Sequence, residues 1–377
     1  MKSLKCYIRA VRNRAALAYN SHMDFRTDRK ILVLESDDWG SVRMSSRKSW
    51  EALKAMGYAV DKRPYERYDA LETNSDVECL AGVLLKYTDH HGHHPVITAN
   101  YLTANPDFEA IRINGFSEYV SEPIETTYCN YPASGKVINM MKDGLKEGVF
   151  MPQCHGREHL NVCSWMEALR RRDKDVLMAF SHNMCGISPK GDATRGNSYV
   201  VALRSRTADE ARYVESAVKT ALAEFRKLWG YSSISFVAPN YTWNDRIENI
   251  LVQNGVEIMQ TSRIQRKSST EDYRYLYSGK ASSSGLVYSI RNCQFEPSTS
   301  RRPDDEADSC LKQINQAFCQ HKIAVVSTHR INYVSAIDGS NRENNLKRLD
   351  YLISEVLRRY PEVEFMSSRD LREILTK

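Results

Sequence analysis

Long apolar runs are missing from this sequence of 377 residues. No stretch of about 18 apolar residues occurs, so we expect no transmembrane helix. The N-terminus contains Lys and Arg but no continuous apolar core of the kind that signal peptides have, so we expect none. Internal repeats and low-complexity tracts are also missing, so a repeat architecture is not expected.

Paired cysteines are missing as well. The nine cysteines are an odd number, they are scattered along the chain, and none forms a CxxC motif. A disulfide framework normally shows paired and regularly spaced cysteines. We therefore expect reduced thiols in a cytoplasmic protein.

An excess of charge is missing from most of the chain. Residues 1–30 contain eight Lys or Arg and two Asp, whereas the other residues contain 45 basic and 45 acidic side chains. A nucleic-acid enzyme is expected to carry basic groups around its site, so we expect no nucleic-acid partner.

The basic segment 1–30 is predicted to be a helical extension of the main domain. Leu4, Ile8 and Val11 follow a three-four spacing, with basic residues on a neighbouring face. Cationic amphipathic helices bind anionic lipid surfaces, which predicts a peripheral membrane contact through residues 1–20. The alternative is a helix that closes the bottom of the domain and exposes its basic side to solvent.

Apolar, β-rich segments alternate with stretches of helical character. The predicted strands are 31–34, 96–99, 149–152, 234–238, 256–260, 287–290, 323–327 and 363–366. The predicted helices are 46–56, 75–88, 164–172, 208–228, 243–254, 309–321 and 344–360. This alternation is typical of an α/β fold with a parallel sheet, and about eight such units close a barrel. Two polar stretches, 262–285 and 296–308, are predicted to be long loops.

Two adjacent carboxylates, Asp37 and Asp38, follow the first predicted strand. Adjacent residues of an extended chain point to opposite sides, so one can bind a metal while the other acts as a base. An Asp at this place can also cap a helix. The pair stands in the sequence "ESDDWG", and this context favours a chemical role.

His155 and His159 are four residues apart, a spacing that brings two side chains to one face of a helix. With Asp38 they form a set of nitrogen and oxygen ligands that leaves one position open on a divalent metal, most plausibly zinc. The same residues also fit the H-x-x-E-H motif of a zinc metallopeptidase, with Glu158 as the base.

His329 follows the strand predicted at 323–327 and supplies a candidate general acid opposite Asp37 as base. Polar residues follow the other predicted strands too, and in α/β barrels the active site lies at this end. From these positions we predict that the substrate contacts are Trp39, Asn100, Asn240, Tyr241 and Arg330.

Taken in order, these clusters resemble the motifs of the polysaccharide deacetylase family, the NodB-homology or carbohydrate esterase 4 (CE4) group. The family's T-F-D-D-G motif is similar to residues 35–40, its H-[ST]-x-x-H motif to residues 155–159, and its final L-x-H motif to residues 327–329. The resemblance covers about residues 30–370, so we expect a single domain over 31–377. It implies a distorted (β/α)7-type barrel with mostly parallel strands.

The resemblance also implies roles for the site residues. Asp37 would be the base, Asp38, His155 and His159 would bind the metal, and His329 would be the acid. The implied reaction removes N-acetyl or O-acetyl groups from a carbohydrate, which for a membrane-bound enzyme would be a lipid-linked or surface glycan. A barrel that binds carbohydrate without catalysis is the third alternative.

The sequence departs from the family at the arginine that orients the base, because Val237 stands at that position. Since an Asp beside a divalent ion needs a fixed orientation, we predict that another arginine replaces it. Arg157 and Arg330 are the nearest candidates along the chain.

Overall fold

A computed structural model describes residues 16–190, 198–267 and 273–376 of the chain. Its centre is a nine-stranded sheet in the order β11-β8-β6-β5-β2-β1-β13-β12, with β14 also paired to β1. The strands are β1 (Ile31–Trp39), β2 (Ile97–Leu102), β5 (Phe150–Gly156), β6 (Ser235–Val237), β8 (Ile258–Thr261), β11 (Val287–Ile290), β12 (Cys293–Gln294), β13 (Ala324–His329) and β14 (Glu364–Met366).

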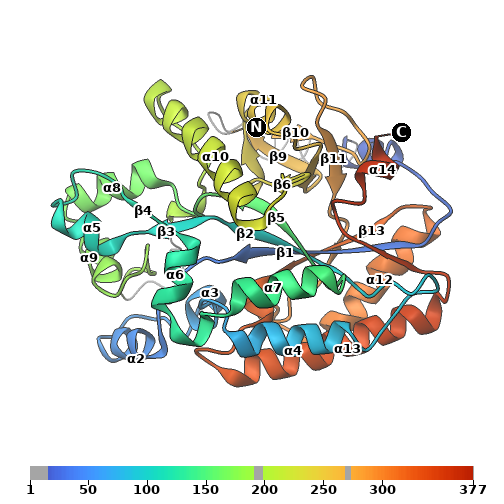
Figure 1. Cartoon of the computed structure of the whole chain (residues 1–377), viewed down its shortest axis with the longest axis horizontal. Coiled ribbons are helices and arrows are strands. Elements are labelled where there is room, and N and C mark those ends of the chain that lie inside the picture. The colour runs from blue at the N-terminus through green and yellow to red at the C-terminus, as the bar shows by residue number, and fades with distance from the viewer. Residues whose placement is uncertain (1–15, 191–197, 268–272, 377) are drawn as a thin grey trace, which may run out of the picture.

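All neighbours in this sheet pair in parallel. The two edge strands, β11 and β12, follow one another in the chain, and the sheet curls between them into a half-barrel (Figure 1). The predicted fold class, a distorted α/β barrel with parallel strands, is confirmed.

Helices cover both sides of the sheet (Figure 1). On one side lie α4 (Asn74–Leu84), α7 (Val137–Lys146), α12 (Glu306–Cys319) and α13 (Gly339–Arg359), and on the other α10 (Ala208–Trp229) and α11 (Asp245–Gln253). A further group gathers beyond the end of β1: α5 (Phe108–Ile113), α8 (Val162–Arg170) and α9 (Lys174–Ser181). The shorter helices include α2 (Arg47–Ala55), α3 (Pro64–Arg67), α6 (Ile124–Asn130) and α14 (Arg372–Leu375).

Local sequence explains where these elements begin and end. Thr73 and Asp76 form a reciprocal capping box at the start of α4. Helix α10 begins after Thr207, whose side chain accepts from Glu210 N, and it ends at Gly230, which has a φ of 81°. Since β1 is buried along its whole length, its polar end residues are held inside the protein.

Two smaller sheets extend the domain beside the carboxyl ends of the strands. One pairs β3 (Ala104–Pro106) with β4 (Ser121–Pro123), and the other joins β7 (Thr242–Trp243), β9 (Ile264–Lys267) and β10 (Tyr273–Tyr275). The prediction of one long loop over 262–285 is therefore wrong, because β9 and β10 pair antiparallel within it. Part of the loop predicted at 296–308 is helical, since α12 begins at Glu306.

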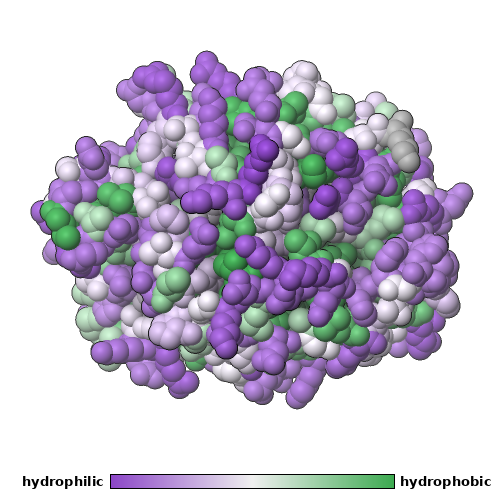
Figure 2. Space-filling model, viewed as in Figure 1, coloured by the Kyte–Doolittle hydropathy of each residue, from purple (hydrophilic) through white to green (hydrophobic). Residues whose placement is uncertain are grey.

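The face of the molecule shown in Figure 2 is mainly hydrophilic, with apolar residues scattered over it. Among the described helices, none is long and apolar enough to span a membrane. The amphipathic helix predicted for residues 1–20 lies mostly outside the described residues, although 16–22 are helical. The segment that follows contacts the barrel, where Asp24 pairs with Arg263 and Lys322.

Candidate metal centre and hydrolytic site

Strand β1 ends in an irregularity that turns its two adjacent aspartates, Asp37 and Asp38, toward one cavity. The pairing register between β1 and β2 shifts between Ser36 and Trp39, and Asp38 has a φ of 72°. A positive φ is uncommon for a residue other than glycine and marks local strain. Asp37 and Asp38 both line the cavity as a result. The expectation that they point to opposite sides of the strand is therefore wrong.

The two histidines meet through a strand and a turn rather than through a helix. His155 lies in β5, and His159 lies in the turn before Asn161, which caps α8. The helical argument for their convergence was therefore wrong, but the two rings do converge, with their centroids 5.3 Å apart.

Asp38, His155 and His159 form a group whose ligand atoms all lie within 4.8 Å of one another. Asp38 Oδ1 is 3.5 Å from His155 Nε2 and 3.6 Å from His159 Nε2. Asp38 Oδ1 and His155 Nε2 are buried and have no hydrogen-bond partner. Buried polar atoms are normally hydrogen-bonded, so these unsatisfied atoms fit a site that binds a cation.

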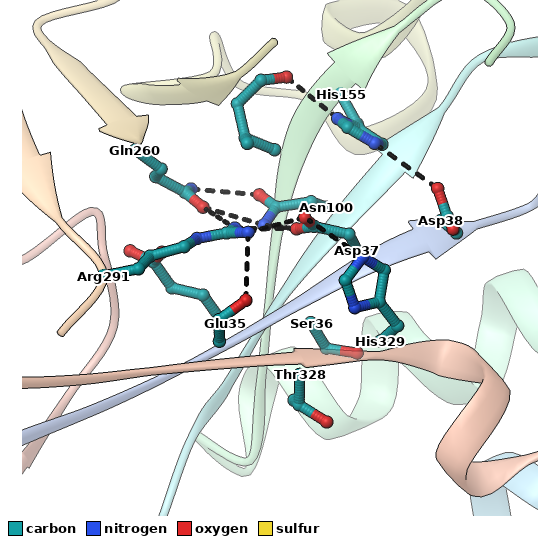
Figure 3. Close-up of polar contacts among 12 residues, drawn as sticks. Glu35, Ser36, Asp37, Asp38, Asn100, His155, Gln260, Arg291, Thr328 and His329 are labelled. Atoms are coloured by element: carbon teal, nitrogen blue, oxygen red, sulfur yellow. Dashed lines mark hydrogen bonds and ion pairs between the residues drawn. The ribbon is translucent and has the colours of Figure 1, made fainter. Parts of the chain in front are cut away.

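Hydrogen bonding, burial and charge around these three side chains suit metal ligands. His155 Nδ1 donates to Val237 O at 2.8 Å, which orients the ring with Nε2 facing Asp38 (Figure 3). Burial lowers the pKa of His159 to about 3, so its ring is neutral. Burial by itself would raise the pKa of Asp38, but Arg43, 3.0 Å from Asp38 Oδ2, together with the neighbouring histidines holds that pKa well below its usual range.

Asp37 is fixed by Arg291, which sequence reasoning did not identify. Arg291 Nη1 donates to Asp37 Oδ2 at 2.6 Å and Nη2 to Oδ1 at 2.7 Å (Figure 3). Burial would raise the pKa of Asp37, but the guanidinium offsets it and holds the pKa at about 2. Arg291 is itself fixed by Glu35 at 2.6 Å and Gln260 at 3.0 Å.

The prediction that an arginine replaces the missing one agrees with this geometry, but the two named candidates are wrong. Arg157 pairs with Glu158 at 2.6 Å, away from Asp37. Arg330 is fully buried and binds Asp69 and Glu72 at 2.6 and 2.8 Å. Arg330 is therefore also wrong as a substrate contact.

Two further predicted substrate contacts are enclosed in the core. Trp39 is 1% exposed, and its ring packs against Tyr101. Asn100 has no exposed surface and donates to Asp37 Oδ1 at 2.8 Å, so it helps to orient this carboxylate from within the core. Direct substrate contact is therefore wrong for both. Asn240 and Tyr241 do line the cavity.

His329 stands on the other side of Asp37, with Nε2 3.9 Å from Asp37 Oδ2. Its Nδ1 donates to Glu296 Oε1 at 2.5 Å, and Asn332 holds the other oxygen of that carboxylate at 2.9 Å. Burial would lower the pKa of His329, but Glu296 outweighs it and raises the pKa to about 9. The imidazole is therefore protonated near neutral pH.

These groups lie together in a cavity of about 750 Å³. The metal-ligand group, Asp37 and His329 all line it, and Tyr65, Tyr199, Tyr241 and Tyr273 add aromatic surface. The backbone N–H of Tyr241 lies in this region but already donates to Ala238 O at 2.9 Å. It is therefore not available to stabilise negative charge on the oxygen of a reacting substrate. The arrangement combines a cation site, an ionised carboxylate and a protonated imidazole.

Four residues that sequence reasoning missed complete this site: Arg43, Tyr65, Arg291 and Glu296. Arg291 directly follows strand β11, so the rule that polar residues follow strands could have found it. The next residue, Asn292, instead binds the backbone of Ile323 and Val325 through its side chain. Glu296 fell in a stretch that was predicted to be loop.

The sequence matches no protein-family model and no curated protein. Polysaccharide deacetylases of the CE4 family are among its structural neighbours. A CE4 family pseudoenzyme from Bacillus anthracis shares 10% identity, with 91% of this chain and 65% of that chain covered and a TM-score of 0.38. The chain thus spans less than two thirds of that neighbour's length.

Two further neighbours are covered over most of their length. A protein from Mycobacterium smegmatis described as a polysaccharide deacetylase shares 10% identity over 94% of this chain and 92% of its own, with a TM-score of 0.41. Puue allantoinase shares 10% over 92% and 90%, with a TM-score of 0.43. At TM-scores this low we draw functional conclusions from the residues of the site alone.

Proposed function

We propose that this chain is a metal-dependent hydrolase that removes N-acetyl or O-acetyl groups from a carbohydrate. The convergence of Asp38, His155 and His159 beside Asp37 and His329 in one cavity carries the proposal. Residues far apart in the sequence meet at one site, and the pKa shifts of Asp37, Asp38, His159 and His329 suit their proposed roles. Such a combination is the geometric signature expected of a hydrolytic site.

Asp38, His155 and His159 would bind a divalent metal, most plausibly zinc, because one carboxylate and two neutral imidazoles form a common zinc ligand set. A metal bound there would polarise the substrate carbonyl and lower the pKa of water at its open position. The buried partner-free atoms of Asp38 and His155 support this assignment.

Asp37 and His329 would move the protons. Asp37 stays ionised because of Arg291, so it can accept a proton from the attacking water. His329 is protonated at neutral pH, so it can donate a proton to the departing nitrogen or oxygen. His329 Nε2 lies 3.9 Å from Asp37 Oδ2 and both residues line the cavity, so a substrate could contact both.

The metallopeptidase alternative is disfavoured by the position of Glu158. Both of its carboxylate oxygens accept from Arg157, at 2.6 and 2.8 Å, and the residue does not line the cavity. A carboxylate outside the cavity is not positioned to act as a base on a substrate at the histidines. A barrel that only binds carbohydrate differs from the enzyme by its lack of turnover, which the following experiment measures.

Metal content and acetate release test the proposal together. Asp38→Ala and His159→Ala should lose stoichiometric metal, because each removes a ligand. Asp37→Asn and His329→Ala should keep the metal and lose about 10²–10⁴-fold in acetate release from a panel of N-acetylated and O-acetylated sugars. Glu158→Gln is the control that should keep both properties.

Each assignment has its own contrary outcome. Unchanged metal content in both ligand variants would remove the metal site. Near-normal turnover in both proton-transfer variants would remove the mechanism. Metal binding without acetate release from any sugar of the panel would favour a binding barrel.

A further inference from the structure

Beyond the metal and acid–base groups, the cavity wall is cationic. Three arginines line it: Arg43, Arg63 and Arg266. The acidic side chains among its described lining residues are Asp37, Asp38 and Glu66. The charge that a substrate meets therefore depends on how far these acids are already neutralised.

All three acids are engaged within the protein. Asp37 is paired with Arg291 and Asp38 with Arg43. Glu66 accepts from Ser188 N at 2.7 Å and Ser188 Oγ at 2.6 Å, and burial raises its pKa. These pairings engage Arg43 as well, with Asp38 and Asp69, so among the described lining residues Arg266 is the cation on which a ligand's anion depends, and a divalent cation at Asp38 would add to the positive charge.

The hairpin of β9 and β10 places one arginine beside an exposed aromatic ring at the cavity. Arg266 lies opposite Tyr273 in the antiparallel pairing, and its guanidinium carbon is 5.8 Å from the centre of that ring. Tyr273 is 43% exposed, and Ile264 on the same hairpin is 37% exposed. An exposed aromatic face beside a guanidinium offers a surface for a sugar ring and a donor for an anion.

We propose that the cavity takes a glycan with an anionic group, a carboxylate or a phosphate, which Arg266 binds while Tyr273 packs against the adjacent sugar ring. The inference rests on the proposed function only in taking this cavity as the substrate site.

Calorimetric binding of matched probes to the whole chain tests this inference without turnover. The first pair is a disaccharide of N-acetylglucosamine and glucuronate with its uronate methyl ester; the second is N-acetylglucosamine 1-phosphate with N-acetylglucosamine. The acid of at least one pair should bind at least about tenfold more tightly than its neutral partner, the size expected from one charged hydrogen bond. The preferred pair identifies the anion as carboxylate or phosphate.

Variants separate the hairpin from the metal. Arg266→Gln should weaken binding of the acidic probe about tenfold and leave the neutral probe little changed. Tyr273→Ala should weaken both, whereas Arg302→Gln, an exposed arginine that does not line the cavity, should change neither. The preference should persist in His159→Ala, since it does not depend on the metal.

Equal binding of acidic and neutral probes would overturn the inference. So would an acid preference that survives Arg266→Gln but disappears in His159→Ala, because the metal would then be the anion receptor. Acid-selective binding without acetate release would leave the inference standing and contradict the proposed hydrolysis. Acetate release from neutral sugars with no acid preference would support the proposed hydrolysis and contradict the inference.

Discussion

Two buried ion pairs set the protonation states of Asp37 and His329, the two residues proposed to transfer protons. Arg291 keeps Asp37 ionised, and Glu296 keeps His329 protonated. Each pair is held by further contacts: Arg291 by Glu35, and Glu296 by Asn332. Arg291 and Glu296 lie at the same end of the sheet as Asp37 and His329. The chemistry of these two residues therefore depends on side chains that need not touch the substrate.

The His329–Glu296 pair predicts the alkaline side of the pH profile. His329 donates a proton only while protonated, so activity should fall as the pH rises through its pKa, which is about 9 before metal binds. Glu296→Gln removes the charge that raises this pKa, so the alkaline limb of kcat/KM should move to lower pH. Proton NMR of the metal-free variant should show the same direction for the His329 ring.

A surface carboxylate provides the control for this prediction. Glu355 pairs with Arg358 and Arg359 on α13, far in sequence from the site, and Glu355→Gln should leave the alkaline limb in place. An unmoved limb in Glu296→Gln would show that another group titrates there.

The Asp37–Arg291 pair predicts a loss of stability that depends on pH. Arg291→Gln leaves Asp37 and Glu35 buried without their cation, so the free energy of unfolding should fall by about 3–5 kcal/mol near neutral pH. In the wild type, the depressed pKa of Asp37 stabilises the fold above the unfolded pKa, and that contribution is lost as the pH falls through about 2. In the variant, burial raises the pKa of Asp37, so protonation should relieve the penalty as the pH falls toward about 4.

Urea unfolding of Arg291→Gln at several pH values measures this effect. Arg29→Gln removes a partly exposed ion pair with Glu364 and should cost only about 0–1 kcal/mol at each pH. A penalty for Arg291→Gln that is as small as that, or that grows as the pH falls, would contradict the assigned pairing.

At the scale of the element, the end of β1 is held in a shape that few residues tolerate. Gly40 has a φ of +83°, and a Cβ added there would lie 2.0 Å from Ile124 Cδ1 and 3.2 Å from Leu102 O. Its N–H also donates to Glu72 Oε1 at 3.0 Å. Gly40 therefore helps to fix the backbone turn that presents Asp38.

Gly40→Ala should reduce stability and metal affinity together. The new methyl group adds both backbone strain and a clash, together about 1–3 kcal/mol, and the shift passes to Asp38 two residues away. Gly148→Ala is the matched control, since its φ is +78° but a Cβ there meets nothing within 4 Å. Equal unfolding free energies for the two variants, measured by urea titration, would show that the contact with Ile124 is not tight.

Sequence patterns predicted the elements with strong local signals. Sequence reasoning found the apolar strands around β1, β5 and β13 and the long amphipathic helix α10, because their burial and periodicity can be recognised from consecutive residues. The short helices α5, α6 and α9 and the hairpin β9–β10 were missed. Each is only a few residues long, so its periodicity is a weak signal and tertiary contacts decide its structure.

The residues of the site show the same division between those that local sequence signals predict and those that depend on tertiary contacts. The positions of Asp37, Asp38, His155, His159 and His329 were predicted because strand ends at one rim lie together in a barrel. The supporting residues Arg291 and Glu296 were not, since their partners are fixed only by how the sheet curls. The helical argument for the histidines was wrong because β5 and the turn after it, not a helix, bring them together.

At the scale of the molecule, the order of strands brings distant segments together. Strand β1 lies between β2 and β13, so Asp37 meets Asn100 on one side and His329 on the other. The curl of the sheet then carries Arg291, which follows the edge strand β11, across to Asp37. The base is thus fixed only when both halves of the sheet are in place, which ties the site to the complete fold.

The uneven charge of the whole chain leads to the last prediction. Residues 1–30 carry a net charge of +6 and the rest of the chain is neutral. We propose that residues 1–20 hold a cytoplasmic enzyme at an anionic membrane surface, near a lipid-linked or surface glycan, because cationic amphipathic helices bind such surfaces.

Deletion of residues 1–15 tests this while keeping the described contacts of Asp24 with Arg263 and Lys322. The full chain should co-sediment with liposomes that contain anionic lipid at low salt, and the shortened chain should not. Raised salt or neutral lipid should release the full chain, because the attraction is screened or absent. Equal partitioning of both chains would instead favour a helix that closes the bottom of the barrel and exposes its basic side to solvent.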